Sequence, residues 1–276
     1  THVIATTFET YAYPIFIKNL RPARDICEKC HSPEKFSDDS LATRLHFAND
    51  MENTPSTTYL ILKTGGGSKR EGEGLGIHWH IVNKVEYYST DKLGQKIPYV
   101  RVYNEDGSTT EYVDVESGLD PKTIDASQIH EMDCITCHNR ITHRVYTPEE
   151  SIDQALALGQ ISKDIPELHK KSVEILHAKY QTQAEGVAAI AALKKYYQDN
   201  FSDYFSNNAD KIASAIAVLQ KIYTDTVFID QKVDWNTHPS SIGHINSPGC
   251  FRCHDGKHLN ADNEAIRMEC NLCHSI

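Results

Sequence analysis

The sequence predicts an α+β fold with little regular structure outside a small antiparallel β section and a helical hairpin or bundle insertion. Three observations support this class. Residues 57–115 alternate in polarity and are rich in β-branched side chains, residues 147–227 show the apolar spacing of helices, and the other segments hold four copies of the motif C-x-x-C-H. We expect three regions: 1–146 with two motifs and the β-rich insertion at about 57–115, 147–230 without a motif, and 231–276 with two motifs.

The four motifs use all eight cysteines of the chain. The cysteines are Cys27, Cys30, Cys134, Cys137, Cys250, Cys253, Cys270 and Cys273, and the histidines that follow them are His31, His138, His254 and His274. Two thiols separated by two residues can both reach the vinyl groups on one edge of a porphyrin, and the next histidine then falls under the iron as its proximal ligand. The spacing therefore predicts four covalently attached haem c groups, held by the first and last regions.

Zinc is the alternative for the two C-terminal cysteine pairs. Sixteen residues separate Cys253 from Cys270, which suits a zinc ribbon with four thiolate ligands. A zinc ribbon, however, places no demand on the residue after the second cysteine, whereas histidine follows in all four copies. The pattern favours haem.

Composition limits the partners and the location of the chain. Its net charge of -10 argues against nucleic acid or an anionic membrane surface as partner. The hydrophobic content of 39% is low for one large aliphatic core, so we expect haem to supply much of the apolar core. The sequence has no run of eighteen apolar residues and thus no membrane span, and it shows no signal peptide, so we expect the numbering to start after processing or at a cut. Because covalent haem attachment takes place outside the bacterial inner membrane, we expect a periplasmic or extracellular protein.

The segments before residue 116 are expected to be extended or β. Pro14 and Pro22 predict an extended lead-in, and Asp39 or Ser40 could cap a short helix that carries His46. Four strands are predicted at 57–64, 77–90, 97–103 and 108–115, with turns at 65–67, 90–95 and 104–107. In the second strand His78 and His80 are two residues apart and should therefore point to one face.

Helical signals begin at Thr147, which can cap a helix with Pro148 at its first position and Glu150 at its third. Thr182 and Glu185 repeat the capping pattern. Two apolar stripes follow, Val187, Ile190, Leu193 and Tyr197, and then Ile212, Ile216, Leu219 and Tyr223. We expect a helical hairpin or small bundle with a structural or docking role.

Eleven further histidines are available as second axial ligands. Haem with two histidine ligands carries electrons, whereas haem that lacks the second ligand can bind nitrite, oxygen or peroxide. The candidates are His143, His244 and His258 beside the motifs, then His78 and His80, then His46, with His130 and His238 after them. We expect structural positions for His2, His169 and His177, which lie at the terminus or in the helical region.

At CITCHNRITH and SPGCFRCHDGKH, and also at NLRPARDICEKCHSPEKF and GIHWHIVNKVEY, the sequence resembles multihaem cytochromes c of the NapC/NirT type over nearly its whole length. The resemblance implies an electron carrier that takes electrons from quinol or a membrane dehydrogenase and passes them outward. It also implies that His143, His244, His258 and one of His78 or His80 are distal ligands. The chain departs from the family pattern because no amino-terminal anchor and no motif precede Cys27, which puts quinol oxidation by this chain in doubt.

The sequence therefore predicts a tetrahaem c-type cytochrome, an electron relay in respiration, anaerobic respiration included, rather than an enzyme. Its expected partners are redox proteins, with a membrane quinol-oxidising complex among the candidate donors. Two alternatives stay open. One is a haem enzyme with an open coordination site that reduces a small oxyanion or peroxide, and the other is a homo-oligomer, filament or subunit of a larger respiratory complex.

Overall fold

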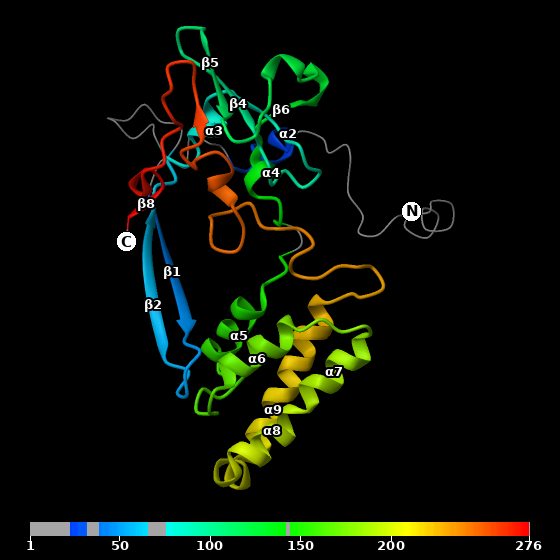
Figure 1. Ribbon diagram of the computed structural model, residues 1–276. Coiled ribbons are helices and arrows are strands. Elements are labelled where there is room, and N and C mark those ends of the chain that lie inside the picture. The colour runs from blue at the N-terminus through cyan, green and yellow to red at the C-terminus, as the bar shows by residue number, and fades with distance from the viewer. Residues whose placement is uncertain (1–22, 32–38, 66–75, 142–143, 276) are drawn as a thin grey trace. The chain divides into compact units, whose positions relative to one another are not determined.

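The chain forms two compact units in a computed structural model (Figure 1). The described residues are 23–31, 39–65, 76–141 and 144–275. The helical unit comprises Arg44–Thr58 and Arg144–Thr237, and the motif unit comprises the remaining described residues. All four C-x-x-C-H motifs belong to the motif unit. The predicted α+β class is confirmed, because the described residues form small antiparallel sheets and several helices.

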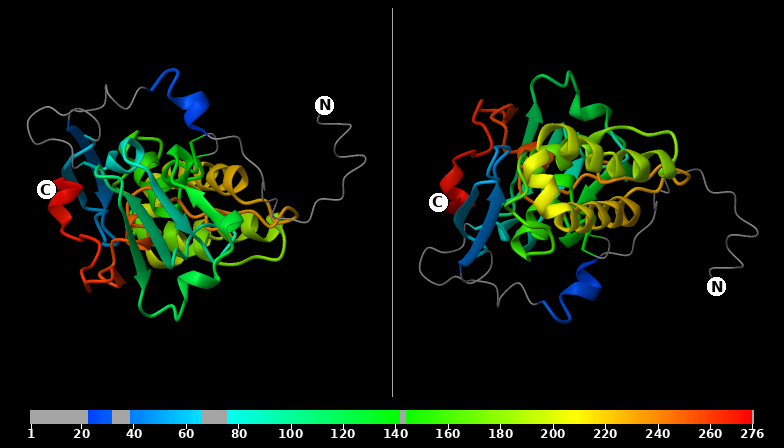
Figure 2. Two further views of the ribbon diagram at one scale, coloured as in Figure 1. Left: turned by 90° about the horizontal axis from the view of Figure 1, so that it is seen from above. Right: turned by 90° about the horizontal axis from the view of Figure 1, so that it is seen from below.

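Five helices build the helical unit, and Figure 2 shows them from two further sides. They are α5 Pro148–Ala157, α6 Leu168–His177, α7 Gln183–Ala191, α8 Leu193–Asn200 and α9 Ser202–Thr226. Both predicted apolar stripes face the core: Ile190, Leu193, Tyr197, Ile212, Leu219 and Tyr223 are buried, and Val187 and Ile216 pack against them. Helix α9 contains a kink at Asn208, whose backbone leaves helical geometry.

The predicted helix starts are confirmed. The Thr147 hydroxyl accepts the Glu150 N–H at 3.3 Å, the Glu150 carboxylate accepts the Thr147 N–H at 3.1 Å, and Pro148 occupies the first helical position. The Thr182 hydroxyl caps α7 by accepting the Glu185 N–H at 3.2 Å. The Glu185 carboxylate, however, accepts the N–H of Gln181 rather than that of Thr182. These caps satisfy amide groups that have no partner within the helix.

The motif unit is organised by a five-stranded antiparallel sheet in the order β6-β3-β4-β5-β7. Its strands are β3 Val85–Tyr88, β4 Tyr99–Tyr103, β5 Thr109–Asp114, β6 Ile129–Glu131 and β7 His258–Leu259. The hairpin between β4 and β5 closes at the predicted turn, where the Asn104 N–H donates to the Ser108 carbonyl at 2.9 Å and Gly107 takes a φ of +83°. A small core of Val85, Ile97, Val100 and Met132 lies against this sheet.

A second sheet has the order β1-β2-β8, with β1 Ser40–Phe47, β2 Pro55–Leu62 and β8 His274–Ser275. The expectation of a short helix carrying His46 is therefore wrong, because His46 lies on β1. The capping signal at Asp39 and Ser40 was local, and pairing with β2 outweighs it. The turn between the strands is held by the Ala48 N–H, which donates to the Thr54 carbonyl at 2.9 Å.

The predicted strand at 77–90 is wrong in its first half. Residues Trp79–Val82 form the short helix α3, and only Val85–Tyr88 is extended. The Asn83 side chain donates to the Trp79 carbonyl at 3.0 Å. This side-chain hydrogen bond stabilises the helical turn, and the carbonyl does not need a partner on a neighbouring strand. Since a helix rotates about 100° per residue, His78 and His80 point in nearly opposite directions and do not share a face.

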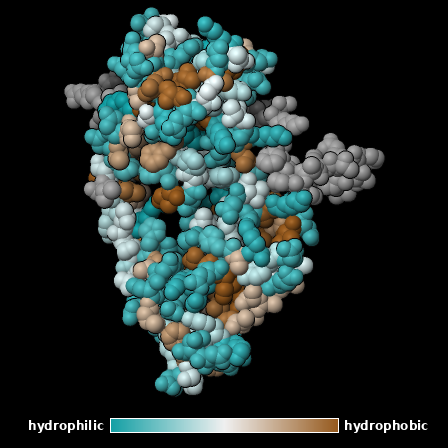
Figure 3. All heavy atoms as spheres, viewed as in Figure 1, coloured by the Kyte–Doolittle hydropathy of each residue, from teal (hydrophilic) through white to brown (hydrophobic). Residues whose placement is uncertain are grey.

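Short elements carry the motifs. They are α2 Arg24–Cys27, α4 Cys134–Cys137, η4 Gly249–Arg252 and η5 Cys270–Leu272, and two further turns, η2 Pro121–Thr123 and η3 Ala126–Gln128, precede β6. The face drawn in Figure 3 is largely hydrophilic, with apolar side chains in separate patches. Among the described helices, none combines the length and the apolar character needed to cross a bilayer.

Candidate haem-binding site

All eight cysteines are free thiols, as covalent attachment to a cofactor requires. The second motif has the best-defined geometry. Asp133 caps α4, its carboxylate accepting the Cys134 N–H, and the Thr136 hydroxyl accepts the Asp133 N–H at 3.0 Å. This capping box was missed in the sequence, where D-x-x-T ahead of a four-residue helix is a weak signal. It fixes the turn that presents Cys134 and Cys137.

The thiols of the central motifs lie in a poorly solvated environment. Burial, followed by the neighbouring Asp133 carboxylate, raises the pKa of Cys134 to about 11. Burial also raises the pKa of Cys253 to about 12 and raises that of Cys137. These thiols are therefore neutral at pH 7, and burying them costs little.

His80 faces the motif histidine His254, and the tautomer of each ring follows from its neighbours. Nδ1 of His80 lies 2.8 Å from the Ile77 carbonyl, and Nδ1 of His254 contacts the Arg267 carbonyl. A carbonyl only accepts, so each Nδ1 donates its hydrogen and each Nε2 carries a lone pair. The two Nε2 atoms are 3.5 Å apart.

That contact cannot be a hydrogen bond between neutral rings, since neither Nε2 carries a hydrogen. Burial lowers the pKa of His80, which keeps this ring neutral. Two lone pairs that point at one another repel unless an electron-pair acceptor lies between them. His80 and His254 could therefore both bind one metal ion.

Two more motif histidines have a second histidine ring nearby. The ring centroids of His78 and His138 are 6.4 Å apart, and those of His244 and His274 are 6.2 Å apart. Nδ1 of His78 donates to the Thr64 carbonyl at 2.8 Å, which again leaves Nε2 with its lone pair. Burial lowers the pKa of His138, so this imidazole is also neutral.

These spacings fit an iron ion held by two imidazoles. With iron–nitrogen bonds of about 2 Å, two coaxial rings have Nε2 atoms about 4 Å apart and centroids about 6 Å apart. The centroid distance between His80 and His254 is 5.7 Å, close to the same value. Three of the four motifs therefore have a donor set that suits six-coordinate haem.

His258 differs from these histidines because both of its ring nitrogens have partners. Nε2 lies 2.6 Å from the Ile97 carbonyl, and Nδ1 lies 2.9 Å from the Asp255 carboxylate. Both partners are hydrogen-bond acceptors, so both ring nitrogens of His258 are engaged by groups of the protein. The side chain is 1% exposed, and it joins β7 to the segment before β4.

His46 belongs to the helical unit, where its Nδ1 lies 3.0 Å from the Asp153 carboxylate. Asp153 also accepts the Phe47 N–H at 2.9 Å and lies 3.2 Å from Nε2 of the buried His169. Burial opposes ionisation of Asp153, but the hydrogen bonds from His169, Phe47 and His46 outweigh it and lower its pKa. In the same unit, His177 pairs with Glu149 at 2.7 Å.

The remaining predicted histidines are less informative. His130 is exposed on β6, opposite Tyr87, with ring centroids 5.9 Å apart. His238 belongs to the motif unit, and burial lowers its pKa. His2 and His143 lie outside the described residues.

Successive motifs are neighbours in space. Cys27 of the first motif lies close enough to Cys134 of the second to affect its pKa. The second and third motifs are joined by Arg252, whose Nη2 donates to the Thr136 carbonyl at 3.1 Å. The third and fourth are joined by His244, which stacks on Phe251 at 4.4 Å while it faces His274. Arg252 and Phe251 occupy the two variable positions of the third motif, where sequence alone gave no signal.

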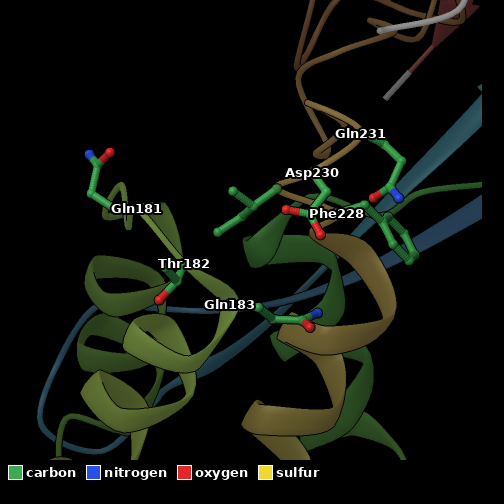
Figure 4. A pocket seen from close by; sticks show the side chains of 7 residues that line it. Gln181, Thr182, Gln183, Phe228, Asp230 and Gln231 are labelled. Carbon is green, nitrogen blue, oxygen red and sulfur yellow. The ribbon is translucent and has the colours of Figure 1, made fainter. Parts of the chain in front are cut away.

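Other sites receive less support. A zinc ribbon would bring four thiols together, but in the part of the chain that the structure describes no three His, Cys, Asp or Glu side chains are close enough to hold a metal ion. A pocket in the helical unit is shown in Figure 4. It is lined by Gln181, Thr182, Gln183, Phe228, Ile229, Asp230 and Gln231, so it offers neither a thiol nor an imidazole.

Comparison with known proteins gave one informative match. The chain is similar to the cytochrome c-type protein ImcH of Geobacter sulfurreducens, with 42% identity over 277 residues that cover 99% of this chain and 54% of the relative. The chain thus spans about half the length of the curated relative that it matches. No protein-family model and no solved structure matches it.

Proposed function

Starting from the likeness to a cytochrome c-type protein, we propose that this chain binds four haem c groups and relays electrons between redox partners. One observation carries the proposal. The Nε2 atoms of His80 and His254 lie 3.5 Å apart, and each carries a lone pair that faces the other. Each cysteine pair would form the thioether bonds, and each motif histidine would be the proximal ligand. When bound, the haem supplies an iron that gains and loses one electron.

The protein residues orient the ligands. We assign His78, His80 and His244 as second ligands opposite His138, His254 and His274 respectively. Backbone carbonyls accept the Nδ1–H of His78, His80 and His254, which fixes the tautomer that leaves Nε2 without a hydrogen. His46 and His258 are left out of the set, because Asp153 holds one and two acceptors hold the other. The family resemblance implies that His143 is a distal ligand, and we propose it for the remaining motif histidine, His31.

The neighbour contacts support a linear order of the four haems that follows the sequence. Cys30 in the first motif and Cys270 in the last are exposed, whereas Cys137 and Cys253 are half-buried. We propose that electrons enter at one terminal motif and leave at the other. Two histidine ligands per iron leave no coordination site for a substrate, which favours a carrier over an enzyme.

The finer assignments also belong to this proposal. They are membership of the NapC/NirT type, a periplasmic or extracellular location, and redox proteins as partners, with a membrane quinol-oxidising complex as a candidate donor. The net charge of -10 favours partners that present a basic surface, and added salt should weaken their association.

Intact-mass spectrometry of the purified full chain tests the proposal, combined with ferric EPR spectra. The expected result is a mass increase of four haems, no thiol that can be alkylated, and low-spin signals. A colourless protein with eight reactive thiols would refute haem binding. Haem-loaded protein with a large high-spin signal would instead indicate an enzyme with an open iron.

A further inference from the structure

Arg252 lies between the two cysteines of the third motif and bonds to three separate segments of the motif unit. Its Nε donates to the Gly249 carbonyl at 2.8 Å, its Nη1 to the Gly94 carbonyl at 2.7 Å, and its Nη2 to the Thr136 carbonyl at 3.1 Å. Thr136 lies between the cysteines of the second motif, and Gly94 lies in the loop between β3 and β4. One planar guanidinium therefore fixes the third motif against the second and against the sheet.

The charge of Arg252 is not neutralised locally. All three partners are carbonyl oxygens, and none of the described carboxylates lies within 4 Å of the guanidinium in an ion pair. A guanidinium stays protonated in proteins, so a full positive charge lies here. It lines a cleft together with Gly94, Thr136 and Asn139, which allows water to solvate part of it.

Both adjoining motifs lie beside this positive charge. Arg252 stands between Cys250 and Cys253, and the Thr136 carbonyl that its Nη2 reaches at 3.1 Å stands between Cys134 and Cys137. A nearby cation stabilises an added electron by Coulomb attraction, and it does so more strongly where water is partly excluded. The same field would therefore act on whatever redox group these cysteines hold.

We propose that Arg252 is a positioning residue that sets the separation between the second and third haems and raises the reduction potentials of both. This inference rests on the proposed function, since it requires haem on both motifs. Neutral carbonyl partners suit this role, because a carboxylate partner would cancel the charge that acts on the two irons.

The test uses the haem-loaded full chain with Arg252→Gln and Arg252→Lys. An NMR-monitored redox titration follows each haem separately, and thermal unfolding is recorded in parallel. In Arg252→Gln, two of the four midpoint potentials should shift to more negative values while the other two stay in place. In Arg252→Lys the shift should be smaller, because the positive charge remains. It should not vanish, because one ammonium cannot make all three hydrogen bonds of the guanidinium.

Arg101→Gln is the matched control. Arg101 is a half-buried arginine on β4 whose Nε lies 3.1 Å from Glu111 and whose Nη1 lies 3.4 Å from Glu86. Among the described residues, the hydrogen bonds and ion pairs of Arg101 stay within the sheet and reach no motif. Its removal changes the net charge by the same amount as Arg252→Gln but away from the motif turns, so all four potentials should stay in place.

The outcomes separate this inference from the proposed function. Unchanged potentials in Arg252→Gln together with a lower unfolding temperature would make Arg252 merely structural and overturn the inference. Equal shifts of all four haems, or equal shifts in Arg101→Gln, would also overturn it. A chain without covalent haem gives no titration at all, and that result would contradict the proposed function instead.

Discussion

Replacement of His80 by alanine should open one haem of the four. Nε2 of His80 lies 3.5 Å from Nε2 of His254, and the neighbouring His78 cannot replace it because the His78 ring lies beside His138. The iron on His254 would then have one protein ligand, change to the high-spin state and bind an external ligand.

The magnitude follows from the number of motifs. With the proposed four haems per chain and one of them opened, about a quarter of the ferric haem should become high-spin, and the reduced protein should bind about one carbon monoxide per chain. The wild-type chain should bind far less than this. EPR spin quantitation and carbon monoxide titration of the reduced protein measure both quantities, with intact mass to verify that all four haems remain.

His258→Ala is the comparison that can refute the reasoning. His258 lies four residues after His254, yet both of its nitrogens contact acceptors of the protein. Its removal takes one hydrogen-bond partner from the buried Ile97 carbonyl and one from the Asp255 carboxylate, so it should destabilise the chain by about 2–3 kcal/mol and yet bind no carbon monoxide. If His258→Ala opens an iron, or if His80→Ala stays fully low-spin, the tautomer argument is wrong.

Three predictions concern the helical unit. Asn53→Ala should lower the free energy of unfolding by about 3 kcal/mol, measured by chemical denaturation, because the fully buried Asn53 amide bonds to two carbonyls and to one N–H. Gly186→Ala should destabilise by about 1–2 kcal/mol in the same assay, since an added Cβ would lie 2.3 Å from Cζ of Tyr223 and the strain exceeds the gain in helix propensity; an unchanged midpoint would show that the ring moves freely. The folded pKa of Asp153 is lowered, so its stabilising effect is present above the unfolded value of about 4 and is lost as pH falls through the folded value. In Asp153→Asn the free energy of unfolding should therefore fall less steeply as the pH is lowered below about 4. An unchanged slope would contradict the role given to Asp153.

The helical unit could be predicted closely because its signals are local. Thr147 and Thr182 cap the helices that their sequence context indicates, and the spacing of Ile190, Leu193 and Tyr197 placed their side chains in the core. Each of these signals depends only on residues a few positions apart, so it can be recognised without knowledge of the tertiary contacts.

The environment of the motifs could be predicted only in part, because long-range contacts decide it. His46 was expected on a helix and as a candidate ligand, but β1 pairs with β2 and Asp153 holds the ring. Nearness to a motif also suggested His258 as a ligand, and nothing in the local sequence indicated that the Ile97 carbonyl would meet its Nε2. Sequence distance to a motif is therefore a poor guide to whether a ring nitrogen keeps its lone pair.

For His78 and His80 the wrong prediction concerned local structure. The strand predicted for this segment placed both rings on one face, whereas the helix that the structure shows directs them to different motifs. On a strand, two histidines two residues apart would serve the same face and compete for one iron. On the helical turn that the structure shows, they diverge, so that one faces His138 and the other faces His254. One short segment thereby places a histidine beside each of two motifs, and we propose both as ligands.

The two units differ in how their cores are made, and this difference bears on where the haem belongs. Among the described residues, the main cluster of buried apolar side chains contains sixteen members, all in the helical unit, whereas the cluster in the motif unit has four. Four side chains cannot offset the conformational entropy of ordering a unit built from two small sheets and four short motif turns. Porphyrin rings bound at those turns would supply the missing apolar surface, at roughly 25 cal/mol for each Å² that they bury. The helical unit needs no such help, and it contains no motif.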